Sequence, residues 1–400
     1  MKNTAKPGAS GSQFLLGMGA LLLATAIWLP GVHLLFARRA ASYHRASGVP
    51  PKARALAARH LQLWTQPEQK QRELGRMRLS NAEWDFMGRS FLVWSLAEMS
   101  LREPEAKARY LPVIDQIIDE TIRLEREQGL YFFLMPYAKD RPFVQKPERS
   151  LFLDSEIALV LALRRLIEDK PEYHAPLTER VNAMVERMRR SPALVAESYP
   201  DECWLFDHSV ALAAIRLTDF LEASDHAAFL REWLARAKRN LTHPATGLLV
   251  SSFTTDGAHL DGPEGSSIWM AVYCLRLVDE DFARDQYQRA RKELGRELCG
   301  FAWSREWPRS WKGPLDIDSG AVIPLLDISA GGSGLAFIAA SSFRDTTFLS
   351  KLHTTLDFAG FPKREAGRLK YCASNQVGDA AMLYACVLGP VWDKVLGGKR

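Results

Sequence analysis

The 400-residue sequence has only five cysteines, and none lies in a CxxC pair or near a histidine at zinc-site spacing. An odd number of cysteines in so long a chain also argues against a disulfide framework. A GxSxG nucleophile elbow and a P-loop are both missing. The glycines of SAGGSGLA follow no predicted strand, so they do not form a dinucleotide fingerprint. We therefore expect no metal site and no bound cofactor.

Basic residues interleaved with stacking aromatics are also missing, so we expect no nucleic-acid partner. Hydrophobic residues make up 47% of the chain and charged residues 25%, which is ordinary for a globular protein with a large core. The net charge of +5 is concentrated directly after an apolar N-terminal segment. The basic residues of this region are Arg38, Arg39, Arg45, Lys52, Arg54 and Arg59. Such a cluster is typical of a membrane-proximal segment.

Residues 14–36 contain no Asp, Glu, Lys or Arg. At about 1.5 Å per residue, a helix of this length just spans a hydrocarbon core of about 30 Å. We therefore predict an N-terminal tail (1–13), a transmembrane helix in the lipid bilayer (14–36) and a basic linker (37–51). The alternative is a cleaved signal peptide, but the sequence has no small-x-small site followed by a polar mature start.

The side of the membrane on which the rest of the chain lies stays open. More positive charges follow the apolar segment than precede it, which favours a cytoplasmic domain on a single-pass protein of a bacterial-type inner membrane. An exported substrate would require the opposite side. The sequence also leaves the oligomeric state open.

Six apolar stretches recur along the remaining sequence, with starts about 53 to 66 residues apart. They begin near Gly88, Asp154, Asp207, Glu264, Asp318 and Asp379. More charged stretches between them carry apolar residues at steps of three and four, and residues 52–77 supply the first of these. A helix that is apolar all round must be covered on every side, whereas an amphipathic helix needs cover on one.

These requirements predict an all-α fold, an (α/α)6 toroid over residues 52–400 with six inner helices inside an outer ring. An open solenoid of helical hairpins is the alternative. Six is the number of hairpins in α/α toroids, and the terminal hairpins lack the extra polar face that a solenoid cap needs.

Acidic residues gather where the predicted inner helices begin, so parallel inner helices would bring them to one mouth of the ring. Aspartate is also a favoured N-cap, and capping is the simpler interpretation of any single one of these acids. Asp316 and Asp318 are two residues apart, so only one of them can cap. We select Asp207 and Asp318 as the catalytic pair, with Glu264, Asp316 and Glu156 as alternatives.

Aromatic and polar residues of the connecting segments are the candidate substrate contacts, because sugar rings stack on aromatic faces. A lone histidine such as His208 is more simply explained as a hydrogen-bonded structural residue. The candidate binding residues are Asp154, Tyr199, Glu202, Cys203, Trp204, His208, Trp269, Trp303, Trp307, Trp311, Tyr371 and Asn375.

The segment from Asp154 through YPDECWLFDHSVALAAIRLTDFL to GSSIWMAVYCL resembles the linalool dehydratase-isomerase family and, more loosely, other α/α-toroid enzymes. The resemblance covers roughly residues 150–300. It rests on the Pro200–Asp201 pair, on Ser209 at the opening of an inner helix, and on a Pro-x-x-Gly turn after an outer helix.

This chain departs from that family at the reactive positions. Where the family has two cysteines and a histidine, this sequence has Ser198, Asp207 and Glu156. The resemblance therefore implies a carboxylate site on the same frame. Toroids host hydrolases, lyases, epimerases and cyclases, so the frame alone does not select a reaction.

Three functions are compatible with these features. Acids and tryptophans at one mouth favour glycoside hydrolysis of a carbohydrate, with an inverting mechanism because opposed inner helices are well separated. The second is a lyase or isomerase that acts on a terpenoid or other lipophilic alcohol, with Asp207 as proton donor and Cys203 or Tyr199 nearby. The third is a non-catalytic, membrane-tethered binding module whose acids only cap helices.

Overall fold

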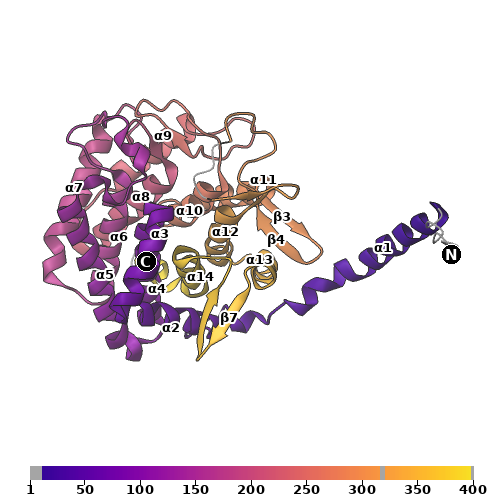
Figure 1. Cartoon of the computed structure of the whole chain (residues 1–400). Coiled ribbons are helices and arrows are strands. Elements are labelled where there is room, and N and C mark those ends of the chain that lie inside the picture. The colour runs from indigo at the N-terminus through magenta and orange to yellow at the C-terminus, as the bar shows by residue number, and fades with distance from the viewer. Residues whose placement is uncertain (1–10, 316–319, 398–400) are drawn as a thin grey trace, which may run out of the picture.

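The computed structural model describes residues 11–315 and 320–397 of the chain. Within these residues the fold is mostly helical, and the long helices pair into hairpins (Figure 1). Six helices form an inner ring, in which each helix contacts the next and the last contacts the first. They are α4 (Ala82–Arg102), α6 (Leu151–Ile167), α8 (Leu205–Glu222), α10 (Gly265–Leu275), α12 (Ala330–Ser342) and α14 (Gln376–Val387). Contact between α14 and α4 closes the ring, which an open solenoid would not do.

The amphipathic stretches form the helices outside this ring. They are α2 (Pro51–Thr65), α3 (Pro67–Ser80), α5 (Lys107–Gln128), α7 (His174–Arg190), α9 (Ala227–Asn240), α11 (Glu280–Glu293) and α13 (Thr346–Ala359). Helix α7 illustrates why amphipathic helices lie on the outside. It buries one face, which carries Leu177, Val181, Met184 and Met188, and leaves the opposite face to solvent. Inner helix α6, in contrast, is buried from Leu151 to Leu166 without interruption.

The first outer segment is two helices, α2 and α3. Gln66 between them has an extended backbone (φ −119°, ψ 92°), and Pro67 occupies the first position of α3. A residue before proline is disfavoured in the helical region, so the chain breaks here.

The predicted inner helix from Asp318 begins later than expected, because α12 starts at Ala330. The preceding residues instead form two short strands, β5 (Val322–Ile323) and β6 (Ile328–Ser329). Pro324 and the β-branched residues around it disfavour a helix. Leu325 and Asp327 have positive φ angles of 74° and 51°, which turn the chain back between the strands. Asp316 and Asp318 themselves lie outside the described residues.

The described residues also form three small antiparallel sheets, which the predicted all-α fold did not include. The largest has the order β3-β4-β6-β5, with β3 (Gly295–Leu298) and β4 (Phe301–Ser304) paired as a hairpin. Strand β1 (Cys203–Trp204) pairs with β2 (Ser252–Phe253), and β7 (Pro362–Glu365) pairs with β8 (Arg368–Tyr371). The remaining elements are helix α15 (Pro390–Gly397) and the short 3-10 helices at His33–Leu35, Ala40–Ser42, Pro104–Ala106, Leu130–Phe132, Pro136–Lys139 and Pro171–Tyr173.

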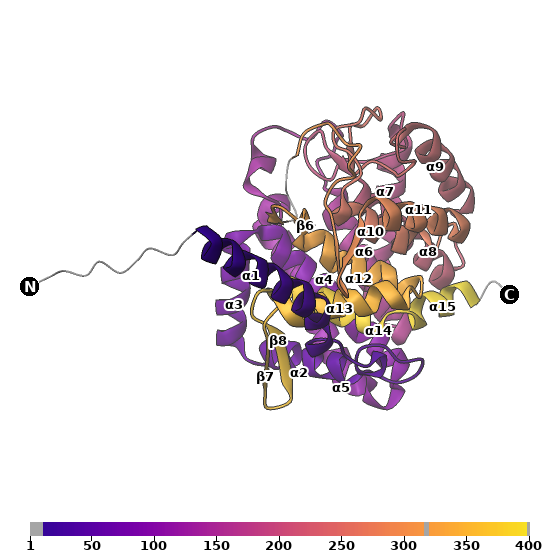
Figure 2. The same ribbon diagram turned by 90° about the vertical axis from the view of Figure 1, so that its right-hand side faces the viewer.

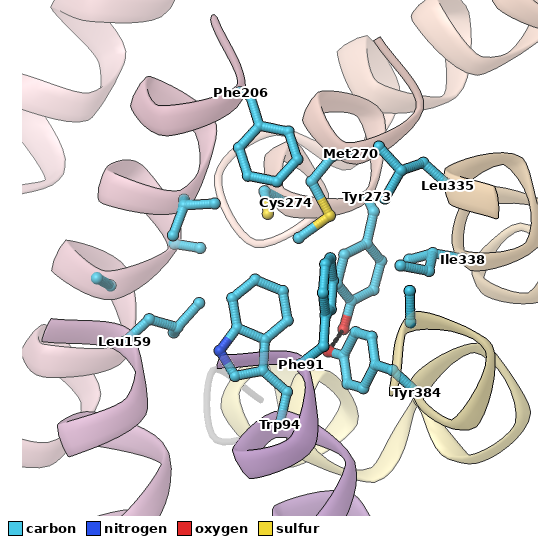
Figure 3. Packing of buried hydrophobic residues seen from close by; sticks show 14 of the residues in the cluster. Phe91, Trp94, Leu159, Phe206, Met270, Tyr273, Cys274, Leu335, Ile338 and Tyr384 are labelled. Carbon is cyan, nitrogen blue, oxygen red and sulfur yellow. Dashed lines mark hydrogen bonds between the residues drawn. The ribbon is translucent and has the colours of Figure 1, made fainter. Parts of the chain in front are cut away.

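The interior of the ring is filled by apolar side chains from all around it. Figure 3 shows Phe91 and Trp94 of α4 facing Tyr273 of α10 and Tyr384 of α14, whose hydroxyls share a hydrogen bond. All four side chains are at most 2% exposed. This packing occupies the middle of the ring, and the cavity described below lies towards the end where the inner helices begin.

Helix α1 (Gly11–Val32) leaves the domain as a separate rod (Figures 1 and 2). None of its residues is buried, and with the short helix that follows it forms a 25-residue apolar span, long enough to cross a membrane. An N-terminal signal sequence has the same length and composition.

Candidate active site

A cavity of about 490 Å³ opens at the end of the ring where the inner helices begin. Its wall comes from the first turns of all six inner helices, with Phe152 of α6 and Ala330 of α12 as examples. Connecting segments complete it with Tyr137, Tyr199 and Trp204. All six inner helices therefore point their N-terminal ends towards one space.

The wall is largely aromatic, aliphatic or made of small residues. Among the described residues, Glu83 and Asp207 are the carboxylates that line it, and no Lys, Arg or His does. The expectation of a mouth ringed by many acids is therefore wrong for this part of the chain. Neutral polar groups are contributed by Ser266, Ser267 and Asn375, among others.

Asp207 lies in the first turn of α8 and is only 5% exposed. Burial, together with the negative charge of Glu83, raises the pKa of Asp207 to about 8, although a hydrogen bond with Ser198 opposes the shift. At neutral pH this carboxyl group therefore holds a proton. The adjoining segment is fixed because the Leu205 amide donates to the Ser251 carbonyl (2.8 Å).

Glu83 lies in the first turn of α4, just after Asn81, whose side chain caps the helix by accepting from the Trp84 amide (3.1 Å). The hydroxyl of Tyr199 donates a hydrogen bond to Glu83 and accepts one from the Met135 amide (2.9 Å). A hydrogen bond to a carboxylate favours its ionised form. The cavity thus holds a carboxyl group with a raised pKa, Asp207, and a second carboxyl group, Glu83, that accepts a hydrogen bond from Tyr199.

Glu83 is not among the acids predicted from the sequence, because the first inner helix is expected there to begin near Gly88. The segment SNAEW carried the missing signal, since Asn is a favoured N-cap and helices usually gather acids in the first turn. Starting the helix at Asn81 would have placed Glu83 beside the other acids.

Glu156 lies behind the cavity wall. It is 1% exposed on α6, does not line the cavity, and one of its carboxylate oxygens, Oε2, has no hydrogen-bond partner among the described residues. Burial raises the pKa of Glu156 to about 8, and the charge of Asp207 contributes to the shift. The two carboxyl groups therefore influence each other through the wall.

The other predicted acids lie elsewhere. Asp154 is buried in an ion network, where it accepts from Arg149 (2.6 Å) and Arg180 (2.8 Å). Glu264 is buried directly before α10 and does not line the cavity. Glu202 is at the rim, where it pairs with Arg141 (2.7 Å) and accepts from the Tyr137 hydroxyl (3.3 Å).

The acids at the inner helix starts are not the caps. Asn81, Ser329 and Asn375 cap α4, α12 and α14, whereas the starts of α6 and α8 have no side-chain cap. Asp379, which burial gives a raised pKa of about 7, accepts from the Tyr371 amide instead (3.3 Å). The capping interpretation is therefore wrong for the described acids Asp154, Asp207 and Asp379.

His208 and Cys203 are structural. His208 is fully buried; its Nδ1 donates to the Trp204 carbonyl (2.7 Å) and its Nε2 accepts from the Ala196 amide (3.0 Å). Burial lowers the pKa of His208 to about 4, so it is neutral and both nitrogens are occupied. Cys203 is buried in β1, and burial raises the pKa of its thiol. Neither lines the cavity.

Of the predicted aromatic contacts, Tyr199 and Trp204 line the cavity, as does Asn375. Trp269 and Trp303 are buried, with their indole N–H groups bonded to Ser304 and to the Leu326 carbonyl. The other aromatic residues predicted as substrate contacts do not line the cavity: Trp269, Trp303, Trp307, Trp311 and Tyr371. Sequence composition placed these side chains at a mouth, but the four-stranded sheet and its neighbours cover several of them.

Metal ligands were not expected from the sequence. Within residues 11–315 and 320–397, no group of three or more His, Cys, Asp or Glu side chains is arranged to hold a metal ion.

Comparison with known proteins finds no matching family model and no matching curated protein. The resemblance to the linalool dehydratase-isomerase family therefore remains a prediction. Solved structures do have a similar arrangement of helical hairpins. A GH76 alpha-mannanase from Bacteroides thetaiotaomicron is 11% identical, with a TM-score of 0.49 over 78% of this chain and 87% of that chain.

Two further structures are similar at the same level. A glycoside hydrolase of family 105 from C. acetobutylicum is 11% identical, with a TM-score of 0.49 over 78% of this chain and 94% of that chain. A polysaccharide lyase is 9% identical, with a TM-score of 0.44 over 86% of this chain and 98% of that chain. A likeness this distant carries no activity or substrate over to this chain.

Proposed function

We propose that this chain is a membrane-anchored enzyme that cleaves a C–O bond by general acid and base catalysis, most simply the glycosidic bond of a carbohydrate. One observation carries the proposal. Two carboxyl groups from different inner helices, Asp207 and Glu83, line one cavity; burial raises the pKa of Asp207 to about 8, and Glu83 accepts a hydrogen bond from Tyr199. Such a division of roles is what glycoside hydrolysis requires.

Asp207 is the general acid. It donates its proton to the glycosidic oxygen as the bond from this oxygen to the anomeric carbon breaks. Glu83 is the base, which removes a proton from the water that adds its hydroxyl to the anomeric carbon. The carboxyl groups then return to their starting states by proton exchange with solvent. In a retaining variant of this reaction, Glu83 would attack the carbon itself.

Aromatic rings support a carbohydrate as the substrate. Trp84 and Trp204 line the cavity, and Tyr137 stacks on Tyr199 with ring centroids 4.9 Å apart. The flat faces of such rings are suited to the apolar faces of sugars. Ser266, Ser267 and Asn375 are available for hydrogen bonds to hydroxyl groups.

A lipophilic alcohol is the second candidate substrate, and the apolar wall favours it. Met87, Phe91, Phe152, Phe206 and Leu335 line the same cavity as the two carboxyl groups. In this reaction Asp207 would protonate the hydroxyl group, which leaves as water, and Glu83 would remove a proton from the neighbouring carbon to form an alkene. The same acid and base would serve both reactions.

The deciding experiment uses the full chain in detergent with a panel of glycosides and glycans and a panel of terpenoid alcohols. Reducing-sugar release identifies the hydrolase, and gas chromatography of alkenes identifies the lyase. Asp207→Asn and Glu83→Gln should abolish whichever activity is found, while Glu202→Gln at the rim serves as the matched control. Activity that survives both substitutions would rule out this assignment.

The membrane anchor is part of the proposal. The exposed, apolar α1 supports a single span, with the domain on the cytoplasmic side by the charge bias of the linker. Alkaline extraction of membranes and mass spectrometry of the mature N-terminus test it. A mature chain that begins after residue 36 would show a cleaved signal peptide instead.

A further inference from the structure

Large apolar side chains are exposed around the point where α1 meets the domain. We call six of them the apolar collar: Leu298, Ile323, Leu325, Leu326, Phe358 and Phe361, which are 44–97% exposed. They come from the β3–β4–β6–β5 sheet and from the junction between α13 and β7. In Figure 2, α1 lies in front of this face, with β6 drawn on one side of it and β7 and β8 on the other, while Figure 1 shows that the helix projects away from the domain.

The parts of the collar are connected to one another. Leu298 is paired with Phe301 across the β3–β4 hairpin, and the Phe301 ring contacts that of Phe358 on α13 (centroids 5.3 Å apart). Leu326 is held to the same sheet because its carbonyl accepts from the indole of Trp303 (3.0 Å). Leu298 and Phe358 are thus joined through Phe301, and the turn that carries Leu325 and Leu326 follows at the other end of β4. Exposed apolar side chains gathered on one domain face indicate an interaction site.

The end of α1 is packed against this surface. The His33 ring meets Phe301 edge-on (6.4 Å), Phe36 meets Phe358 (5.1 Å), and Arg38 forms an ion pair with Asp357 (3.3 Å). The collar is thus fixed beside the end of the span and cannot lie far from the bilayer once α1 is inserted. Arg38 and Arg39 add positive charge where anionic headgroups would be.

The collar also borders the cavity. Ala321 lines the cavity, and Ile323 of the collar is two residues further along β5, or about 7 Å at the rise of an extended strand. Leu325, at the turn between β5 and β6, is 97% exposed and has a positive φ of 74°. Gly or Asn would adopt this backbone with less strain. Covering the exposed leucine side chain would remove its apolar surface from water and stabilise this arrangement.

We infer that the apolar collar lies in the interfacial region of the lipid bilayer and holds the cavity mouth at the membrane surface. A substrate with a lipid tail, such as a lipid-linked glycoside, can then place its polar end in the cavity while the tail stays in the membrane. The lipid contact stands independently, whereas the substrate class rests on the proposed function. Both the collar and α1 would be covered by the same bilayer.

The first test measures where Leu325 lies. Cys299 and Cys372 are replaced by Ser in the full chain, Leu325→Cys is labelled with an environment-sensitive fluorophore, and the protein is placed in phosphatidylcholine–phosphatidylglycerol vesicles. Leu79→Cys is the matched control, because Leu79 is 90% exposed on α3, outside the collar. The label at 325 should shift to the blue and be quenched by lipids that carry a nitroxide, while the label at 79 should do neither.

Two outcomes would overturn the inference. Quenching at 325 that is no greater than at 79 would place the collar in water. A blue shift at 325 without quenching by nitroxide lipids would show that protein, such as a second copy of the chain, covers the collar. Both labelled proteins must float with the vesicles, so a failure of α1 to insert is detected separately.

The second test addresses the substrate. A hexadecyl glycoside in vesicles is compared with the matching ethyl glycoside in solution, using the double variant Leu325→Ser/Phe361→Ser. Loss of two interfacial apolar contacts should lower turnover of the vesicle substrate at least about tenfold and leave turnover of the soluble one unchanged. An equal effect on both would overturn the substrate inference. If neither glycoside is cleaved by the unmodified chain, hydrolysis fails, while the fluorescence result still decides the lipid contact.

Discussion

The hydroxyl of Tyr199 donates a hydrogen bond to Glu83 across the cavity wall and is itself held by the Met135 amide. Tyr199 and Glu83 are 116 positions apart in the sequence, so the bond between them joins the first inner helix to the loop before the third. It gives Glu83 a fixed orientation and stabilises its negative charge.

We therefore predict that Tyr199→Phe lowers kcat by roughly ten- to a hundredfold, because the base loses its donor while the ring remains. The Met135 amide also loses its acceptor, so the melting temperature should fall slightly. Tyr137→Phe keeps the stacked pair and is the matched control. If the two substitutions have the same effect on kcat, the bond to Glu83 has no part in catalysis.

Asp207 should make the folded chain less stable as the pH rises. Its pKa is raised from 3.8 to about 8, so the folded state keeps a proton that the unfolded chain loses. Between about pH 4 and pH 8, this group therefore lowers the free energy of unfolding with increasing pH. The Asp207→Asn chain lacks this titrating group and therefore does not lose stability in this way. The difference between its melting temperature and that of the unmodified chain should increase in its favour from pH 5 to pH 8. A difference that stays constant with pH would contradict the buried, protonated state.

The proton on Asp207 should also determine how activity depends on pH. Because Asp207 acts as an acid, kcat/KM should fall as the pH rises through about 8. Glu156→Gln should move this alkaline fall in kcat/KM to lower pH. The pKa of Glu156 is also about 8, and the negative charge that it acquires near this pH helps Asp207 to keep its proton. Profiles from pH 5 to pH 10 measure both effects. An unchanged alkaline fall in the Glu156→Gln chain would show that the two groups are not coupled.

His208 should matter for stability and not for chemistry. His208→Leu removes two buried hydrogen bonds and leaves the Ala196 amide without an acceptor, so we expect a loss of about 2–4 kcal/mol in the free energy of unfolding. Denaturant titration measures this loss. The kcat of the folded fraction and its pH profile should match those of the unmodified chain. A shifted pH profile would show that His208 takes part in catalysis.

The sequence was informative where burial leaves a periodic pattern. The repeated apolar stretches located the inner helices α4, α6, α8, α10 and α14 because a helix covered on every side has no charged face. The amphipathic stretches located the outer helices for the same reason. Asp207 could be selected in advance because it stands at the start of such a stretch.

Other parts of the site depend on contacts between distant segments. Trp303 and Trp269 were predicted to stack on a substrate because of their residue type. In the structure, strand pairing and the packing of α12 and α13 cover them. Short strands such as β5 and β6 are stabilised by their partners and not by local propensity, so the segment before α12 resembled a helix. Glu83 was missed through a boundary error of six residues, from Gly88 to Ala82, and boundaries are the least certain feature of a periodic pattern.

The closure of the ring has a consequence for how the protein is made. Helix α4 is covered by α14, and buried Glu98 of α4 accepts from the amides of Gly389 and Val391 at 3.1 and 3.0 Å, contacts that span almost three hundred residues. The core therefore stays open until the last part of the chain has left the ribosome. Helix α1 leaves the ribosome before the ring helices do, so the membrane insertion proposed for it would tether the growing chain while its interior is exposed.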